Sequence, residues 1–187
     1  AREASLFNNF ETTKDNRRKL ALLKSSFVMP PPLDESLAKE LSEIQSTLRA
    51  MYGNGEYCFE NNECFDLEGF EAIMDLSRNE DELLRAWSGW HEVGKPMKPL
   101  YLRMVEIGNK GSIDLGYDGL DDLWFSKYDM PKEEFLSEID RVLDEVKPLY
   151  EALHCHVRDS LNKEYGDGIV SKTGPLPAHI LGNMLSL

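Results

Sequence analysis

Histidine is the residue in this sequence with the widest chemistry, since its imidazole can act as a general base or bind a metal ion. The chain contains His91, His154, His156 and His179. His91 precedes a glutamate, as in the zinc motif HExxH, but the fifth residue is Lys95 and the Gly-Lys-Pro sequence there would end a helix. We therefore predict no zinc site at His91.

The other three histidines do not form a ligand set. His154 and His156 lie two positions apart, which is about 200° around a helix, so they cannot bind one metal ion. We expect one of them in a core and the other at a polar surface. His179 follows a Gly-Pro-Leu-Pro turn that the prolines make rigid, at the start of a new helical turn. A histidine at such a position most often makes a hydrogen bond, and we predict that role for His179.

The carboxylates and glycines also predict no catalytic site. Asp121-Asp122 and Glu133-Glu134 are adjacent pairs, and adjacent side chains diverge on a helix. Acidic residues in a first helical turn are stabilised by the helix dipole, which explains both pairs. The sequence contains neither a glycine-rich phosphate loop nor the GxSxG turn of a serine hydrolase.

Cys58 and Cys64 bracket the polar sequence FENNE, which is short enough for a disulfide. From spacing alone, two unrelated reduced thiols are the favoured interpretation and a disulfide is the alternative. Cys155 falls within a predicted helix, where we expect a buried, small apolar residue.

Apolar residues recur at steps of three and four over most of the chain, which predicts helices. The longest is expected to begin after Asp129 as its cap, to kink or join at Pro148, and to stop at Gly166. Alternation typical of strands nowhere exceeds four residues. We therefore predict an all-α fold in one unit over residues 1–187. Expected helices cover about residues 16–23, 37–51, 70–74, 80–90, 99–115 and 131–165, with a further turn from 178.

The charge balance disfavours some partners. The chain has 34 acidic and 21 basic residues and a net charge of −13, which disfavours binding to nucleic acid or to anionic membranes. There is no apolar run of about 18 residues and no signal-peptide pattern at the N-terminus, so we predict no membrane insertion. We expect a segment cut from a mature protein.

Two sequence motifs resemble those of a known enzyme family. PLYEALHCHVR and GPLPAHILGNM are similar to PLY-x-x-LHA-[YF]-VR and GPIPAHLLG-[DN]-M of the angiotensin-converting-enzyme family of zinc peptidyl-dipeptidases. Further motifs of the family are resembled upstream by AWSGWHEVGKPMKPLY, LWFSKYDMP and CFENNECFDLE. The similarity therefore runs from about Lys19 to Met184. The resemblance implies a segment of the mostly helical, two-lobed zinc peptidase fold. The family's zinc helix lies downstream of GPIPAHLLG, so it implies that the zinc-binding half is absent from this chain.

The resemblance also assigns residues. It implies that Tyr128 helps to bind a chloride ion and that Glu68 lies on the substrate-cleft side. It implies a disulfide between Cys58 and Cys64. It therefore favours the disulfide over two reduced thiols, because members of the family function outside the cytosol, where disulfides persist.

Some positions depart from the family pattern. His91 stands where members with two chloride sites have arginine, so the first chloride site is expected to be absent. Phe125 replaces the arginine of W-R-S, Gly69 replaces a proline after Glu68, and Leu185 replaces a tryptophan.

The resemblance implies part of a secreted or periplasmic zinc metallopeptidase that removes C-terminal dipeptides from peptides. The complete protein is expected to use zinc and chloride, to act on a peptide substrate, and to pair this segment with the remaining half of the peptidase domain. For this chain alone we predict no catalytic residue, no metal and no activity. The alternative is a non-catalytic helical interaction module that kept the family scaffold and lost the zinc site.

Overall fold

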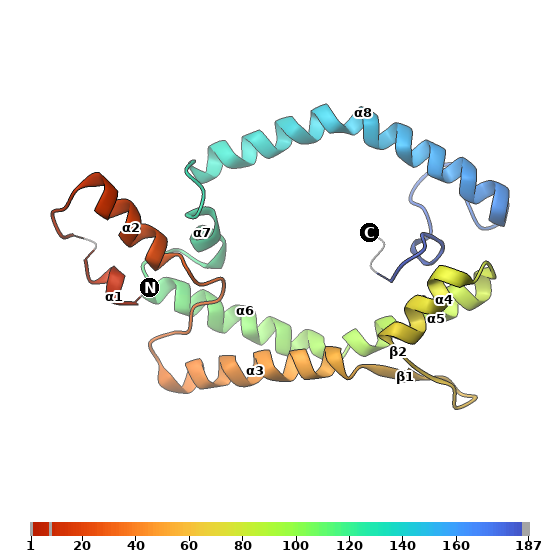
Figure 1. The fold of residues 1–187 in the computed structure, drawn as a ribbon, viewed down its shortest axis with the longest axis horizontal. Helices are drawn as coiled ribbons and strands as arrows, with labels where there is room; N and C mark the ends of the chain where they lie inside the picture. Colours follow the sequence, from red (N-terminus) through yellow and green to blue (C-terminus); the bar gives the residue numbers. More distant parts are fainter. Residues whose placement is uncertain (1, 8, 185–187) are drawn as a thin grey trace. The chain divides into compact units, whose positions relative to one another are not determined.

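A computed structural model describes residues 2–7 and 9–184 of the chain. Helices dominate the described part, in agreement with the predicted all-α fold, and Figure 1 labels them. The elements in chain order are α1 (Arg2–Ser5), α2 (Lys14–Lys24), α3 (Glu35–Gly53), β1 (Glu56–Cys58), β2 (Cys64–Asp66), α4 (Leu67–Leu76), α5 (Glu80–Gly94), α6 (Met97–Asp114), α7 (Leu120–Phe125), α8 (Lys132–Tyr165) and a 3₁₀ turn, η1 (Ala178–Ile180).

The chain divides into two compact units, and each combines two separate stretches of sequence. The first unit comprises residues 1–48 and 99–141, and the second comprises residues 49–98 and 142–187. Among the described residues, no helix is long and apolar enough to span a membrane.

Side-chain caps explain where several helices begin. Thr13 accepts a hydrogen bond from the amide of Asn16, and Asn79 accepts one from the amide of Glu82. Asp34 accepts a hydrogen bond from the amide of Leu37 at 3.2 Å, so it caps α3. Each of these side-chain oxygens accepts a hydrogen bond from a backbone amide that has no partner within the first turn of the helix.

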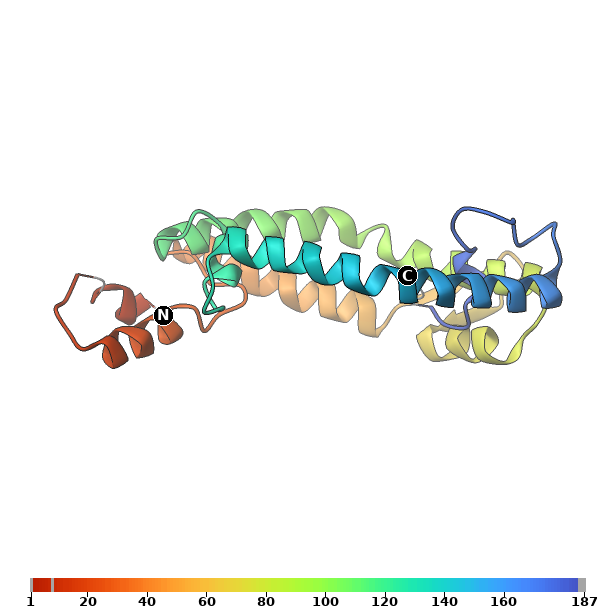
Figure 2. The ribbon, with the colours of Figure 1, turned by 90° about the horizontal axis from the view of Figure 1, so that it is seen from above.

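In the first unit, α3 and α6 run side by side in both views (Figures 1 and 2). The guanidinium of Arg103 donates to both carboxylate oxygens of Glu40, at 2.7 and 2.9 Å. Gly111 allows a close approach of the chain, because a Cβ there would lie 2.0 Å from the carbonyl oxygen of Pro30. The buried apolar residues that form the interior of this unit include Leu41, Ile44, Leu48, Ile107, Leu115, Leu120 and Leu123.

The second unit has an aromatic core. Phe70 is fully buried, and its ring lies 5.5 Å from that of Phe65 and 6.4 Å from that of Trp90. Trp90 also faces this core, since its exposed fraction is 6%. The buried members of this core are Phe70, Met74, Leu83, Ala86, Trp90, Val170, Ile180 and Met184.

A small hairpin is the exception to the all-helical prediction. Strands β1 and β2 pair antiparallel with Cys58 opposite Cys64. Each strand has three residues, too few to show a period of two in the sequence. Arg85 of α5 covers the hairpin, with its guanidinium 3.9 Å from the centre of the Phe59 ring.

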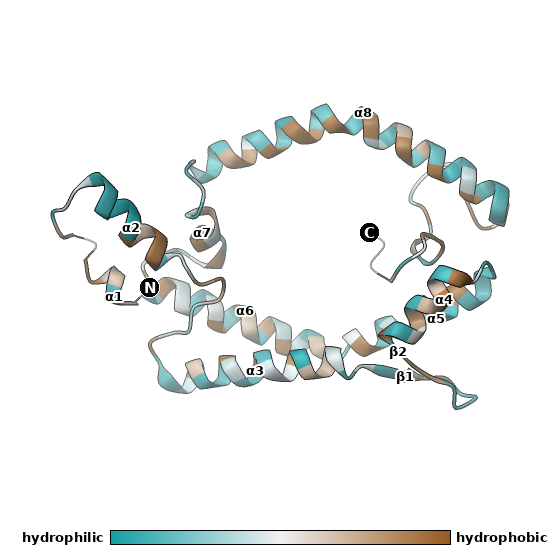
Figure 3. Cartoon of the chain, viewed as in Figure 1, coloured by the Kyte–Doolittle hydropathy of each residue, from teal (hydrophilic) through white to brown (hydrophobic). Residues whose placement is uncertain are grey.

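Helix α8 runs from Lys132 to Tyr165 without a break, so Pro148 does not divide it into two helices. It ends before Gly166, as predicted, and Gly166 has a positive φ of 79°. The predicted cap Asp129 is wrong: its carboxylate binds Arg18 instead, with a 2.9 Å hydrogen bond from Nη2. None of the residues of α8 is buried, although Figure 3 shows hydrophobic residues recurring along it.

Candidate functional site

The segment that follows α8 packs through its apolar residues into the aromatic core of the second unit. Val170 is fully buried, Ile180 is 5% exposed and Met184 is 2% exposed, and all three belong to the aromatic core. The 3₁₀ turn η1 forms at the predicted new helical turn, after the rigid Gly-Pro-Leu-Pro sequence. The segment is thereby fixed at both of its ends.

Two side chains of α8, one helical turn apart, donate hydrogen bonds to the loop that connects α8 to η1. The guanidinium of Arg158 donates to the carbonyl oxygens of Ser171 and Gly174. The amide of Asn162 donates to the carboxylate of Asp167 at 2.7 Å and to the carbonyl of Val170 at 3.3 Å. Neither role was predicted from the sequence, although Arg158 is the last residue of the PLYEALHCHVR motif and its place there was a signal for it.

His179 makes the hydrogen bond that we predicted for it. Its Nε2 lies 2.8 Å from Oε1 of Glu80 in the first turn of α5, and the two side chains are 12% and 23% exposed. Because Glu80 lies far away in sequence, no local pattern could have identified it as the partner. The pair attaches η1 to the start of α5.

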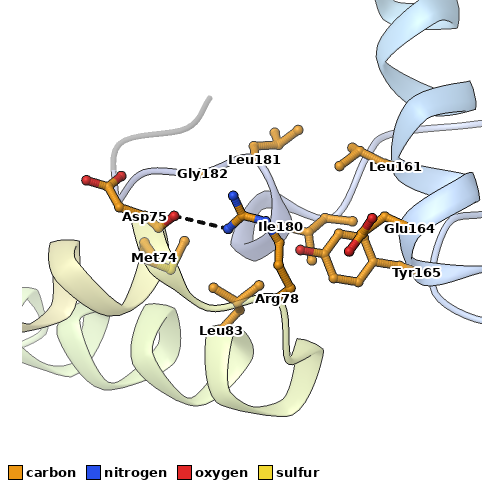
Figure 4. Close-up of a pocket in the computed structure, with 10 residues that line it drawn as sticks. All are labelled: Met74, Asp75, Arg78, Leu83, Leu161, Glu164, Tyr165, Ile180, Leu181 and Gly182. Carbon is orange, nitrogen blue, oxygen red and sulfur yellow. Dashed lines mark hydrogen bonds between the residues drawn. The ribbon is translucent and has the colours of Figure 1, made fainter.

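A cavity of about 410 Å³ lies beside this segment (Figure 4). Met74, Leu83 and Ile180 line it with apolar side chains, and the charged side chains of Arg78 and Glu164 also line it. Arg78 donates to the carbonyl oxygens of Asp75 and Ser77, at 3.0 and 2.6 Å. The residues that line the cavity are Met74, Asp75, Arg78, Leu83, Leu161, Glu164, Tyr165, Ile180, Leu181 and Gly182, which include no serine, threonine, cysteine, lysine or histidine.

The histidines make separate contacts. Nδ1 of His91 lies 2.6 Å from the carbonyl oxygen of Trp87, and the two rings lie 3.8 Å apart. His156 is exposed and His154 is only partly buried, so the prediction that one of this pair lies in a core is wrong. The reason is that no other element of the described chain buries any residue of α8.

The described residues do not fit a catalytic zinc ion, which takes three protein ligands and a water molecule. Within residues 2–7 and 9–184, one group of potential ligand atoms lies close enough together, that of Glu56, Cys58 and Cys64. Its two sulfur atoms form a disulfide, so they are not available as thiolate ligands. The described residues therefore offer no ligand set for a catalytic zinc ion.

The disulfide between Cys58 and Cys64 is present in the structure, as the resemblance implied. Cys155 is free and exposed, so the expectation that it is buried is wrong. Its side chain lies on a helix that no other element of the described chain buries.

The two residues assigned by resemblance belong to different units. Tyr128, in the first unit, is 54% exposed and its ring lies 4.2 Å from that of Phe135. Glu68, in the second unit, is exposed in the first turn of α4. Their roles in chloride binding and in the substrate cleft stay predictions. Leu185 lies outside the described residues.

Comparison with known proteins gives consistent matches. A family model described as "Angiotensin-converting enzyme" (Peptidase_M2) matches residues 1–186. The "Angiotensin-converting enzyme-like protein Ace3" of Mus musculus is 34% identical over 173 residues, which are 91% of this chain and 23% of that protein. The angiotensin-converting enzyme of Bos taurus is 36% identical over 148 residues, 78% of this chain and 11% of that protein. The chain therefore spans less than a quarter of the length of these two relatives.

Proposed function

The chain belongs to the angiotensin-converting-enzyme family of metallopeptidases, and from this premise we propose that it is part of a zinc enzyme that removes dipeptides from the C-termini of peptides. Residues 1–187 are then the N-terminal-side helical portion of the peptidase domain. The zinc ion and its ligands belong to the remaining half of that domain.

The observation that carries this proposal is the family match over residues 1–186, which includes both compact units. The fixed segment around His179 supports it, because this segment contains one of the two specific family motifs. Its contacts with Arg158 and Glu80 give the segment one defined position in the second unit.

Within this proposal, Tyr128 contributes to a chloride site and Glu68 to the substrate-cleft side. The complete protein uses zinc and chloride and acts on peptides in a secreted or periplasmic location. The Cys58–Cys64 disulfide supports the location, because disulfides persist mainly in oxidising compartments.

A second candidate is a non-catalytic helical interaction module. The exposed apolar residues of α8 support it, because they offer a surface for a partner. The two candidates differ in whether the longer protein that contains this chain has bound zinc.

The experiment compares the 187-residue chain with the longer protein. Zinc is measured by elemental analysis after dialysis, and hydrolysis of a blocked tripeptide is followed with and without a chelator. We expect one zinc ion per molecule and chelator-sensitive release of a C-terminal dipeptide from the longer protein, and neither from the isolated chain. A longer protein without zinc and without hydrolysis would support the interaction module instead. A stoichiometric zinc ion on the isolated chain would show that a ligand set has been missed.

A further inference from the structure

The hairpin of the second unit places two sulfur atoms and one carboxylate on the same face. Side chains alternate along a strand, so Glu56 and Cys58 share one face of β1, and Cys64 lies opposite Cys58 in the ladder. All three residues are exposed, and their sulfur and carboxylate oxygen atoms lie within 4.8 Å of one another. The two sulfur atoms are bonded to each other, so this group can bind a metal ion only after the disulfide is reduced.

Aromatic packing holds the other face of the hairpin independently of the disulfide. Tyr57, Phe59 and Phe65 pack against the aromatic core. The Phe59 and Phe65 rings lie 6.0 and 5.5 Å from the ring of Phe70. Gly89 of α5 permits this close packing, because a Cβ there would lie 3.0 Å from the rings of both Phe59 and Tyr57. The strands therefore stay attached to the core without a covalent link between them.

Polar contacts hold the loop between the strands. The backbone amide of Phe59 donates to the carbonyl oxygen of Glu63 at 2.9 Å, which closes the loop. The guanidinium of Arg85 lies 3.5 Å from the carboxylate of Glu63. With the loop closed and the aromatic face packed, we expect Cys58 and Cys64 to stay opposite each other after reduction.

The distances in this group suit a tetrahedral zinc ion. Oε1 of Glu56 lies 3.4 Å from Sγ of Cys58, and an oxygen and a sulfur ligand of tetrahedral zinc are about 3.6 Å apart. Two sulfur ligands of zinc are about 3.8 Å apart. Rotation of the two cysteine side chains can reach this separation, because their Cα atoms lie 4.0 Å apart. A water molecule would complete the four ligands.

The ligand atoms also decide the class of cation. Two thiolates and one carboxylate favour thiophilic divalent ions such as zinc, whereas magnesium and calcium take oxygen ligands. The net charge of −13 adds a general attraction for cations. Zinc is therefore the ion that this group fits best.

We propose that the hairpin is a redox-controlled zinc site, which forms when the disulfide is reduced and whose ligands are Glu56, Cys58 and Cys64. The reductant is a dithiol, which supplies two electrons and two protons and is itself oxidised to a disulfide. Zinc then displaces both thiol protons, and the two sulfur atoms bind it as thiolates. The metal ion thereby replaces the disulfide as the link between β1 and β2. This site is separate from the catalytic zinc of the proposed function and does not depend on it.

The test measures metal binding to the reduced and the oxidised form of the same chain. Every sample carries Cys155→Ser, so that Cys58 and Cys64 are the only cysteines. The chain is reduced with a dithiol, the dithiol is removed without oxygen, and alkylation of one portion verifies two thiols per chain. Cobalt(II) is the first probe, because thiolate-to-cobalt charge transfer gives absorption in the near ultraviolet. Zinc is then added to displace the cobalt.

We expect one cobalt ion per reduced chain, with charge-transfer absorption that zinc abolishes. The oxidised chain should show no such absorption and should bind zinc at least about 100-fold more weakly, because its sulfur atoms are not available. Zinc should also raise the urea midpoint of the reduced chain toward that of the oxidised chain, because it binds the folded hairpin.

Variants identify the ligands. Cys58→Ser should weaken zinc binding to the reduced chain about 100-fold, and Glu56→Gln about 10-fold, since each removes one ligand. Glu60→Gln is the matched control and should change nothing, because Glu60 is an exposed carboxylate in the loop of the same hairpin and lies outside the group. Glu56→Gln leaves both cysteines in place, so it tests the site even if Cys58→Ser prevents folding.

Four results would overturn the inference. Absence of charge-transfer absorption in the reduced chain would mean that the two thiols do not bind a metal ion together. One metal ion per two chains would mean that thiols of different chains bind it. Unchanged affinity in Glu56→Gln would exclude the carboxylate from the ligand set. Loss of the near-ultraviolet circular dichroism of the aromatic core on reduction would contradict the packing that keeps the two cysteines opposite each other.

Discussion

The two compact units are stabilised in different ways. Beside its apolar interior, the first unit has close backbone packing at Gly111 and ion pairs between segments distant in sequence, such as Arg103 with Glu40 and Arg18 with Asp129. The second unit depends on an aromatic core around Phe70 and on a disulfide. The first unit should therefore respond to steric change and to pH, and the second to loss of apolar volume and to reduction.

The largest expected effect is on the second unit. Phe70→Ala removes a fully buried ring from the centre of the aromatic core and should lower the free energy of unfolding by about 4 kcal/mol, since the cavity cannot collapse fully. Urea denaturation followed by circular dichroism measures the change. Leu76→Ala on the same helix is the control, because Leu76 is 83% exposed and should change stability by less than about 0.5 kcal/mol. Equal losses for the two variants would contradict an aromatic core.

The next effect is on the first unit. Gly111→Ala places a Cβ 2.0 Å from the carbonyl oxygen of Pro30, and backbone must move to relieve the clash. We expect a loss of about 3 kcal/mol, again measured by urea denaturation. Gly94→Ala is the matched control, since a Cβ there meets no atom within 4 Å and alanine favours helix. A neutral Gly111→Ala would show that the two segments are not in contact.

Reduction should act on the second unit with a smaller effect. Opening the Cys58–Cys64 disulfide removes a short closed loop and should cost about 2 kcal/mol, detected as a lower urea midpoint. Alkylation followed by intact mass measurement should find one reactive thiol, Cys155, before reduction and three after it. Cys155→Ser is the control and should not change the urea midpoint. Three reactive thiols in the oxidised native protein would contradict the disulfide.

The smallest effect is the response of the first unit to acid. Hydrogen bonds from Arg103, Lys132 and Arg18 lower the pKa values of Glu40, Asp121 and Asp129, respectively. A carboxyl group whose pKa is lower in the folded state contributes stability above its unfolded pKa of about 4 and loses it as the pH falls through the folded value. As the pH falls below about 4, protonation of these groups should therefore lower the stability of the first unit, measured as a loss of amide hydrogen-exchange protection in that unit.

Glu40→Gln is the control for the acid response, because the amide removes one of these titrating groups while keeping its shape. The variant should be slightly less stable at pH 6 and should lose less stability between pH 5 and pH 3 than the parent chain. Identical acid responses of the parent and the variant would show that the Arg103–Glu40 pair makes no difference to folding.

Helix positions were largely predictable because they depend on short-range features. Caps at Asp34 and Asn79, the end of α8 at Gly166 and the rigid turn before η1 all follow from residues within one or two turns. The hairpin was missed because strands of three residues carry no detectable period. The division into two units was also missed, since each unit combines stretches that lie far apart in the chain.

The sequence by itself determined the all-α class, the family motifs and the histidines that cannot share a metal ion, because spacing on a helix depends only on local geometry. Tertiary structure alone decided that Glu80 is the partner of His179, that Arg158 holds the loop before η1, and that Asp129 binds Arg18. It also decided that the regular apolar face of α8 is exposed in this chain. An apolar period predicts that a helix face should be buried, but only the neighbouring elements determine whether anything is present to bury it.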